Sequence, residues 1–312
     1  MKKTLNFVFW GTPDVASGTL NILKENGYVP SFIITAPDKP QGRKMIITPP
    51  PVKAWAIENN IPYAQPEKLE TKEIRDVLRT LGRSDGDGQR KFSTENFRGE
   101  QNIPDFFLVV AYGKIIPEDI LNAPTLGSIN VHYSLLPKYR GASPVESAIL
   151  NGDTETGVTI QKMKYKMDSG PIIAEERISI LPDEKAPELR TRLMKTGGGL
   201  LVKILPDFIN KKTTETPQNE EEATFCKKIK KEDGLIDLSD NAEKNYNKFR
   251  AHAHWPRTFF FKNGKRIIIT DATLENDSLD SPLKKHFVIK KVLPEGKKEI
   301  TYGDFIRTNT LK

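Results

Sequence analysis

The chain has 312 residues, which is long enough for two domains of ordinary size, each with a buried core. Hydrophobic residues make up 37% and charged residues 29%, and no apolar run is long enough to cross a bilayer, so the composition excludes a membrane-spanning protein. A formal net charge of +7, from 48 Lys and Arg against 41 Asp and Glu, favours a polyanionic partner, although many solvated surfaces are also basic.

The first half of the chain alternates short apolar runs with helical patterns, at residues 5–10, 15–23, 31–35 and 52–57 in turn. Such alternation is typical of strands joined by helical crossovers. Residues 106–111 form a continuous apolar run, which suits a central strand covered on both faces. The sequence therefore predicts an α/β fold with an open, mostly parallel, Rossmann-like sheet.

Residues 128–134 are a further strand candidate, and the period of two puts Asn130 and His132 on the same face. Residues 158–163 and 172–180 extend the sheet. Residues 187–209 have the pattern of an amphipathic helix, although the triplet Gly197-Gly198-Gly199 weakens it by about 1 kcal/mol per glycine. This helix is expected to close the first domain.

The character of the sequence changes after residue 210. A polar stretch is expected to be an exposed linker, and the short β-type runs beyond it, with a hairpin signal at Asn263-Gly264, favour a small oligonucleotide-binding (OB-like) β-barrel. We expect a catalytic domain at 1–210, a linker at 211–222 and the OB-like domain at 223–312. The polar segment 82–102 is expected to be a mobile surface loop.

Cys226 is the only cysteine, so no internal disulfide can form, and no Cys or His lies near it at metal-ligand spacing. These observations predict a reducing compartment, the cytoplasm, and no metal cofactor.

Residues 5–10 are too short for the core of a signal peptide and end at Gly11-Thr12-Pro13. That turn precedes a helix but lacks the further glycines of a dinucleotide fingerprint, so NAD binding is not expected. A tight structural turn explains it at least as well as a ligand contact.

Basic residues gather in three clusters, two of them near the C-terminus: Lys39, Arg43 and Lys44; Lys227, Lys228, Lys230 and Lys231; Lys284, Lys285, Lys290, Lys291, Lys297 and Lys298. Any one cluster taken alone is more often a solvated face than a binding patch.

The strongest chemical signal combines Asn130 and His132 on one strand with Asp168 on a loop followed by glycine. His132 can move protons near neutral pH. Asn130 can donate its amide N–H to an oxyanion, a role worth roughly 3 kcal/mol. Asp168 can hold the imidazole in one tautomer, stabilise its charged form or anchor a water. Together the three have the parts for acyl transfer to an amine.

The chain resembles the folate-dependent formyltransferases, and the motifs that carry the resemblance are Phe9-Trp10-Gly11-Thr12-Pro13, Ala111-Tyr112-Gly113, Asn130-Val131-His132-Tyr133-Ser134-Leu135-Leu136-Pro137 and the Asp168 loop. A second set is similar to the methionyl-tRNA formyltransferase family within that group: Pro37-Asp38-Lys39-Pro40-Gln41-Gly42-Arg43, Gln65-Pro66-Glu67-Lys68-Leu69, Lys231-Glu232-Asp233-Gly234, Trp255-Pro256, Asn263-Gly264-Lys265 and Pro294-Glu295-Gly296-Lys297-Lys298. The resemblance covers nearly the whole chain.

The resemblance implies 10-formyltetrahydrofolate as formyl donor, initiator methionyl-tRNA as acceptor, and Asn130, His132 and Asp168 as the catalytic trio. It implies that Ser134, Leu135, Leu136 and Pro137 line the folate site and that the basic loop carrying Lys39, Arg43 and Lys44 contacts the acceptor stem, with Arg43 as the main contact. The family usually has Gly and two lysines after this arginine, whereas Lys44-Met45-Ile46 leaves one basic residue here. We expect a weaker grip on RNA from this loop, and a monomeric protein.

Two alternatives remain open. A nucleotide-sugar N-formyltransferase would use the same trio and donor, but a small acceptor needs neither the C-terminal module nor the basic loop. A non-catalytic RNA-binding protein on a degenerate scaffold would have no need of the intact trio.

Overall fold

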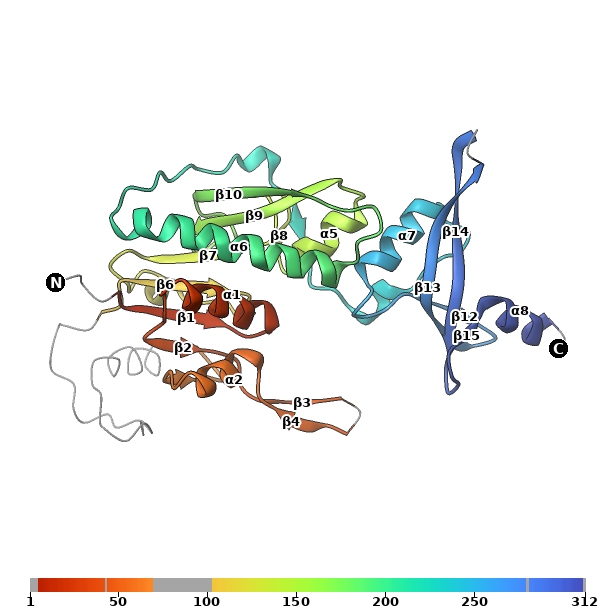
Figure 1. The fold of residues 1–312 in the computed structure, drawn as a ribbon, viewed down its shortest axis with the longest axis horizontal. Coiled ribbons are helices and arrows are strands. Elements are labelled where there is room, and N and C mark those ends of the chain that lie inside the picture. Colours follow the sequence, from red (N-terminus) through yellow and green to blue (C-terminus); the bar gives the residue numbers. More distant parts are fainter. Residues whose placement is uncertain (1–4, 43, 70–102, 279–280, 311–312) are drawn as a thin grey trace. The chain divides into compact units, whose positions relative to one another are not determined.

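The computed structural model describes residues 5–42, 44–69, 103–278 and 281–310 (Figure 1). The chain divides into two compact units. The first comprises Met1–Arg140, Gly157–Arg177 and Thr191–Thr224, and the second comprises Gly141–Thr156, Ile178–Arg190 and Phe225–Lys312. The second unit thus takes up two short segments from the first half of the chain. The single-cut division into 1–210, 211–222 and 223–312 remains a prediction, and segment 82–102 lies outside the described residues.

The first unit is built on a seven-stranded sheet in the order β10-β9-β7-β6-β1-β2-β5. Its strands are β1 (Phe7–Gly11), β2 (Phe32–Ile34), β5 (Tyr63–Ala64), β6 (Phe106–Val110), β7 (Ser128–His132), β9 (Glu155–Lys162) and β10 (Ile172–Ser179). The pairs β1·β2, β1·β6, β2·β5 and β6·β7 are parallel, and β7·β9 is antiparallel. The predicted open, mostly parallel sheet is therefore confirmed.

Helices α1 (Asp14–Glu25), α2 (Pro51–Glu58) and α6 (Ala186–Ile209) connect or cover these strands (Figure 1). The short helix α4 (Glu118–Leu121) lies between β6 and β7 in the chain. The continuous apolar run of β6 is buried at all five positions, as a central strand with both faces covered requires. One core cluster joins β1, β2 and β6 to α4 on the face that carries Trp10, Phe107 and Val109.

Two glycines of the α6 triplet lie where the helix packs closely against its neighbours. A Cβ on Gly197 would stand 3.0 Å from Val131 Cγ1, and one on Gly198 would stand 2.6 Å from Ile22 Cδ1 of α1. Gly199 has open space around it. Two of the three glycines thus allow close packing, which explains why the helix includes residues of low helical propensity.

The stretch after α6 is polar, as the sequence indicates, but it makes specific contacts within the first unit. Thr216 exchanges two backbone hydrogen bonds with Ile172 at the start of β10. Thr224 accepts the N–H of Tyr139 at its hydroxyl, 2.8 Å away. Residues 216–224 therefore run along the sheet edge and the loops beside it.

The second unit contains α5 (Pro144–Leu150), β11 (Phe225–Cys226), α7 (Ala242–Ala251), β12 (Phe259–Lys262), β13 (Lys265–Ser278), β14 (Ser281–Pro294), β15 (Ile300–Thr301) and α8 (Tyr302–Thr310). Strands β12, β13, β14 and β15 form an antiparallel sheet in that order, with a core shared by α7 and α8. Among the described residues this order includes no pairing of β12 with β15. The structure thus gives a small antiparallel module, and closure into a barrel stays a prediction.

The hairpin expected at Asn263-Gly264 is present. Lys262 pairs with Lys265 at the end of the β12·β13 ladder, which leaves two residues in the loop. Both have positive φ, +52° at Asn263 and +72° at Gly264. This is the conformation of a type I′ turn, which Asn-Gly adopts at low cost and which matches the twist of the two strands.

His252, which follows α7, gives the second unit a pH-dependent stability. It is 1% exposed, and neither ring nitrogen has a hydrogen-bond partner among the described residues. Burial, reinforced by the Lys248 ammonium and opposed by Asp233, lowers the pKa of the imidazole from 6.5 to about 4. The unfolded chain binds a proton in this window that the folded chain does not, so stability is full above pH 6.5 and falls as the pH drops towards 4.

We expect His252→Leu to flatten this dependence, because the apolar side chain does not titrate and leaves no buried partner unsatisfied. Between pH 6.5 and pH 4 the wild type should lose up to about 3 kcal/mol of unfolding free energy through this one group. Denaturant unfolding at pH 7.0 and pH 4.5 measures the difference, with the exposed His254→Leu as the matched control. Equal losses of stability in the wild type and His252→Leu would contradict the assignment.

Within the described part of the chain, no helix combines the length and apolar character needed to span a membrane.

Candidate active site

Asn130 and His132 lie at the carboxyl end of β7, on the face turned away from α6. A Cβ on Gly197 of that helix would lie 3.0 Å from Val131 and 3.6 Å from Tyr133, so these two neighbours face α6. Alternation along the strand sends Asn130 and His132 to the opposite face. Asn130 is paired with Val109 of β6 on one side and with Gln161 of β9 on the other. Both side chains are buried, at 9% and 5% exposed. The expected shared face is confirmed.

The imidazole of His132 is held between a carbonyl and a carboxylate. Its Nε2 lies 2.9 Å from the main-chain oxygen of Tyr139, and its Nδ1 lies 3.7 Å from Oδ2 of Asp168. A carbonyl oxygen only accepts hydrogen bonds, so Nε2 must carry a hydrogen. In the neutral ring, Nδ1 is then the nitrogen that can take up a proton. The contact that selects the tautomer is Tyr139 O, a main-chain group that no side-chain motif reveals.

A short turn after β7 brings the Tyr139 carbonyl to His132. The Ser134 hydroxyl donates to Lys138 O at 2.6 Å, and the Lys138 N–H donates to Leu135 O at 3.0 Å. Tyr139 itself has φ of +60°. The turn therefore reverses the chain so that residue 139 lies against residue 132.

The residues expected at the folate site, Ser134, Leu135, Leu136 and Pro137, all belong to this turn. Ser134 and Leu136 are buried, while Leu135 and Pro137 are partly exposed. Thr159 of β9 fixes the turn, because its hydroxyl donates to Ser134 O at 2.8 Å and accepts the Leu136 N–H at 3.0 Å. The turn thus supports His132 by placing the Tyr139 carbonyl beside it. Contact of the turn with folate stays a prediction.

Asp168 lies on a loop between β9 and β10 that approaches β9 closely. Its backbone has φ of +49°, a left-handed conformation that costs non-glycine residues on the order of 1 to 3 kcal/mol unless the surroundings hold it. Gln161 donates through Nε2 to Asp168 Oδ1 at 2.8 Å. A Cβ on Gly170 would lie 1.7 Å from Lys162 O. Glycine is therefore required for this loop to approach the strand.

Gln218 and Arg140 form a second support behind the same loop. Gln218 Nε2 donates to the main-chain oxygens of Asp168, at 2.8 Å, and Gly170, at 2.6 Å. Its Oε1 accepts from Arg140 Nε at 2.9 Å and Nη2 at 2.8 Å. The Arg140 side chain is fully buried and also pairs with Glu220, with Nη2 2.8 Å from Oε1.

The Glu220 carboxylate balances the charge of this support at the surface. Hydrogen bonds from Arg140 and then Lys166 lower the pKa of Glu220 from 4.5 to about 2. The carboxylate is half exposed, so solvent screens the pair and its electrostatic contribution is modest. The buried guanidinium nevertheless keeps its partner charged throughout the physiological pH range.

The turn Gly11-Thr12-Pro13 links the carboxyl ends of β1 and β6. The Thr12 hydroxyl donates to Tyr112 O at 3.1 Å, and Ala111 and Gly113 both have positive φ. Burial raises the pKa of Tyr112, so its phenol stays neutral. A structural role as a strand-to-helix turn is therefore sufficient to explain Gly11-Thr12-Pro13.

The predicted RNA-binding loop contains a small hairpin of β3 (Lys39–Gln41) and β4 (Ile46–Thr48). Lys39 and Lys44 are exposed, and Arg43 lies outside the described residues. The exposed side chains that follow are apolar: Met45, Ile46 and Ile47. The basic character of this loop is accordingly limited, as the sequence indicates.

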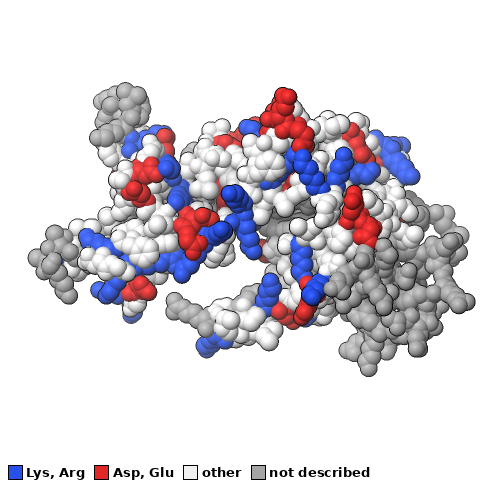
Figure 2. Space-filling model, turned by 180° about the vertical axis from the view of Figure 1, so that it is seen from behind, with Lys and Arg blue, Asp and Glu red and all other residues white. Residues whose placement is uncertain are grey.

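Several lysines of the C-terminal module are partly neutralised by ion pairs, namely Lys285 with Glu243, Lys290 with Glu275 and Lys291 with Glu299. On the face seen in Figure 2, basic and acidic side chains lie among one another rather than as one continuous basic surface. Because of these ion pairs, a lysine cluster of this module taken alone is weak support for an RNA site.

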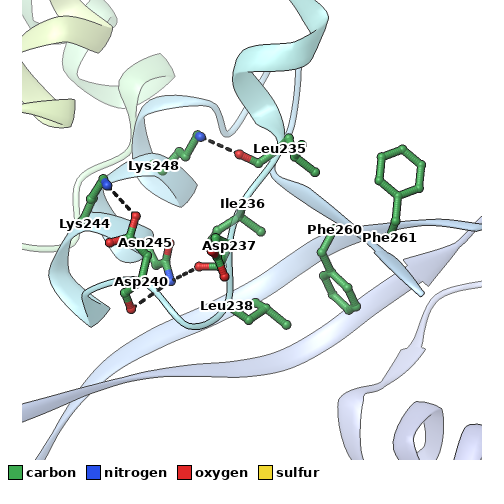
Figure 3. Close-up of a pocket in the computed structure, with 10 residues that line it drawn as sticks. All are labelled: Leu235, Ile236, Asp237, Leu238, Asp240, Lys244, Asn245, Lys248, Phe260 and Phe261. Atoms are coloured by element: carbon green, nitrogen blue, oxygen red, sulfur yellow. Dashed lines mark hydrogen bonds and ion pairs between the residues drawn. The ribbon is translucent and has the colours of Figure 1, made fainter. Parts of the chain in front are cut away.

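One hollow of about 530 Å³ lies in the second unit, between the segment before α7 and β12 (Figure 3). Its polar groups are used internally: Asn245 Nδ2 donates to Asp237 O at 2.8 Å, Lys248 donates to Leu235 O, and Lys244 pairs with Asp240. These contacts anchor residues 235–240 to α7. None of the trio lines this hollow, and the described residues include no group of three His, Cys, Asp or Glu placed to hold a metal ion.

The structure brings His132 and Asp168 together and places Asn130 on the strand face that carries His132, while the catalytic roles of the three stay a prediction. The residues that support them were missed. Gln161 gave little signal, because Thr159 and Lys162 beside it in the segment 158–163 are also polar. Gln218 and Arg140 gave none, because Gln218 lies 50 residues from Asp168 in a polar stretch.

Two family models match the chain. Residues 2–205 match the formyl transferase model, and residues 228–284 match the model of the formyl transferase C-terminal domain. The first match alone covers more than half of the chain.

Relatives and solved structures agree with these matches. The chain is 36% identical to a methionyl-tRNA formyltransferase of Lysinibacillus sphaericus, over 97% of this chain and 95% of the relative, and 37% identical to one of a Sulfurihydrogenibium species, over 89% and 83%. A crystal structure of an N-formyltransferase from Helicobacter canadensis, in complex with folinic acid and dTDP-3-aminofucose, is similar in fold, with a TM-score of 0.62 and 18% identity over 88% of this chain and 90% of that chain. The chain therefore belongs to the formyl transferase family, within its methionyl-tRNA formyltransferase branch.

Proposed function

We propose that this protein transfers the formyl group of 10-formyltetrahydrofolate to the α-amine of methionyl initiator tRNA, for translation initiation, and that Asn130, His132 and Asp168 carry out the transfer. The observation that carries the proposal is the state of His132. Its Nε2–H is fixed on Tyr139 O and its Nδ1 faces the Asp168 carboxylate.

The reaction begins when the neutral amine of the charged methionine attacks the formyl carbon. A free α-amine has a pKa of about 7.7 to 8, which leaves a usable neutral fraction at physiological pH. As the new C–N bond forms, the amine becomes acidic, and His132 Nδ1 accepts its proton. The imidazolium is then stabilised by the nearby Asp168 carboxylate.

Breakdown of the tetrahedral intermediate releases the folate. The negative charge on the former carbonyl oxygen is stabilised by the Asn130 amide, a contribution of roughly 3 kcal/mol for such a donor. The bond from the formyl carbon to the folate nitrogen breaks, and the proton held on His132 goes to that nitrogen. The products are an N-formylated methionyl-tRNA and tetrahydrofolate.

The substrate contacts belong to the same proposal. Ser134, Leu135, Leu136 and Pro137 line the folate site, and Arg43, with Lys39 and Lys44, contacts the acceptor stem of the tRNA. The module at 223–312 adds further contacts to tRNA. We infer a monomer acting in the cytoplasm, where initiator tRNA is charged and used.

A direct assay tests the proposal. The protein is incubated with 10-formyltetrahydrofolate and methionyl initiator tRNA, and formylmethionine and tetrahydrofolate are quantified after hydrolysis of the ester. Equimolar formation of the two products is expected, with deacylated tRNA giving neither. Consumption of the folate without formylmethionine would contradict the assigned acceptor.

Arg43→Ala should weaken the productive use of tRNA and reduce its salt dependence. One lost phosphate contact lowers the slope of log K against log salt by about one. Binding of the tRNA is measured from low to physiological salt, with Lys44→Ala expected to have a smaller effect. Lys203→Ala on α6 is the control for loss of an exposed cation. An unchanged slope for Arg43→Ala would assign the loop another task.

A further inference from the structure

The Asp168 loop is held from two sides by glutamine side chains. Gln161 contacts the carboxylate itself, with Nε2 2.8 Å from Oδ1. Gln218 contacts the backbone, with Nε2 2.8 Å from Asp168 O and 2.6 Å from Gly170 O. One contact therefore orients the side chain, and the other fixes the main chain on either side of Ser169.

The Gln218 amide has a defined orientation because its two ends face partners of opposite kind. Two carbonyl oxygens accept from Nε2, and the Arg140 guanidinium, which can only donate, contacts Oε1 twice. Flipping the amide would place its N–H groups against the guanidinium and its oxygen against two carbonyls. Arg140 thus determines which end of Gln218 faces the loop.

The loop needs such support. Asp168 has φ of +49°, and such conformations persist where the surroundings over-determine them. Gly170 is packed against Lys162 O with no room for a side chain. Both features bring the carboxylate within 3.7 Å of His132 Nδ1, so a small relaxation of the backbone would change the contact on which catalysis depends.

We propose that Gln218 is a positioning residue for the transfer reaction: oriented by Arg140, it holds the Asp168 loop in the conformation that places the carboxylate beside His132. The inference rests on the proposed function, because it takes Asp168 to be part of the catalytic trio. It assigns Gln218 no contact with either substrate. Gln161 still orients the carboxylate when Gln218 is changed, so the loss should be smaller than for removal of Asp168.

The test uses Gln218→Glu in the full chain. This substitution keeps the length and the acceptor for Arg140 but replaces the N–H donor with a carboxylate oxygen that repels the two carbonyls. Misplacement of a reacting group by about 1 Å costs up to about 100-fold, so kcat should fall roughly 10- to 100-fold while KM for both substrates changes less than about twofold. Gln218→Met, which is uncharged, should show the same split and guards against an effect of charge alone.

Asn219→Asp is the matched control, since it makes the same amide-to-carboxylate change one residue along. Asn219 caps the short 3-10 helix Glu220–Glu222 by accepting the Glu221 N–H, a contact that a carboxylate keeps. Its Nδ2 also donates to Glu222 Oε1 at 3.0 Å, so the substitution gives up this exposed contact. Its kcat should equal that of the wild type. A loss in the control as large as in Gln218→Glu would overturn the positioning role.

A double-mutant cycle with Asp168→Ala decides whether Gln218 acts through Asp168. If it does, adding Gln218→Glu to Asp168→Ala lowers kcat no further. Independent losses that multiply would overturn the inference while leaving the trio intact. Full activity of Asp168→Ala by itself would instead overturn the proposed role of Asp168, so the two failures are distinguishable.

Discussion

His132→Ala should lower kcat by at least about 100-fold, because general acid–base assistance contributes roughly 100- to 10,000-fold and no other group within the described site replaces Nδ1. Asp168→Ala should give a loss of the same order, since the imidazolium then lacks its carboxylate. Folate affinity should change little in either variant, because the 134–138 turn is closed by its own hydrogen bonds. Single-turnover formylation, with folate binding measured by fluorescence titration, gives both quantities.

The exposed His254→Ala is the control for loss of an imidazole elsewhere. It should retain the wild-type single-turnover rate. Near-normal rates in both His132→Ala and Asp168→Ala would remove the pair from the mechanism.

Gly170→Ala should also reduce kcat by about 100-fold, although the glycine has no side chain to lose. A Cβ at this position would stand 1.7 Å from the main-chain oxygen of Lys162, the last residue of β9, which is paired with Ile129 of β7. The loop must then shift by an ångström or more and carry the Asp168 carboxylate away from His132. Steady-state kinetics should show the loss in kcat more than in KM.

Gly199→Ala is a suitable comparison, because a Cβ there meets nothing within 4 Å and lies in the middle of α6. It should leave kcat unchanged and stabilise the protein by about 0.5 to 1 kcal/mol, as glycine-to-alanine changes in helices do. Gly170→Ala with wild-type kcat would show that the loop tolerates displacement, against the proposed geometry.

Much of the fold follows from patterns within single segments. The apolar run of β6, the alternation that puts Asn130 and His132 on one face and the Asn263-Gly264 turn each depend on local chemistry, and each is observed. The close packing of Gly197 and Gly198 could not be foreseen, because it depends on which strand and helix α6 meets. Helix propensity alone says that these glycines destabilise α6 and does not explain why they are there.

The support of the site lay beyond the sequence for a related reason. The tautomer of His132 is set by a main-chain oxygen, which every residue has, and so leaves no trace in residue types. Gln218 belongs to a polar stretch that indicates a linker by composition, yet two carbonyls and a buried guanidinium determine its position. The sequence suggests the residues that carry out the chemistry, whereas the residues that hold them in place are identified only from the three-dimensional structure.

The fold by itself does not choose the acceptor. An N-formyltransferase solved with an amino-sugar nucleotide has a similar fold at 18% identity, so the arrangement of the sheet serves more than one acceptor class. The relatives at 36% and 37% identity, of which the chain covers 95% and 83%, distinguish the two. We propose that the C-terminal module and the loop containing Arg43 are the parts that bind the large RNA acceptor.

A competition between acceptors tests the central claim most directly. One reaction contains the wild-type protein, 10-formyltetrahydrofolate, methionyl initiator tRNA and a dTDP-linked amino sugar, and mass spectrometry quantifies each formylated product over time. We predict that formylmethionyl-tRNA accumulates, at a kcat/KM at least about 1,000-fold above that for the sugar, because the sugar makes none of the RNA contacts that contribute binding energy. Formylation of the amino sugar at equal or greater kcat/KM would contradict the account.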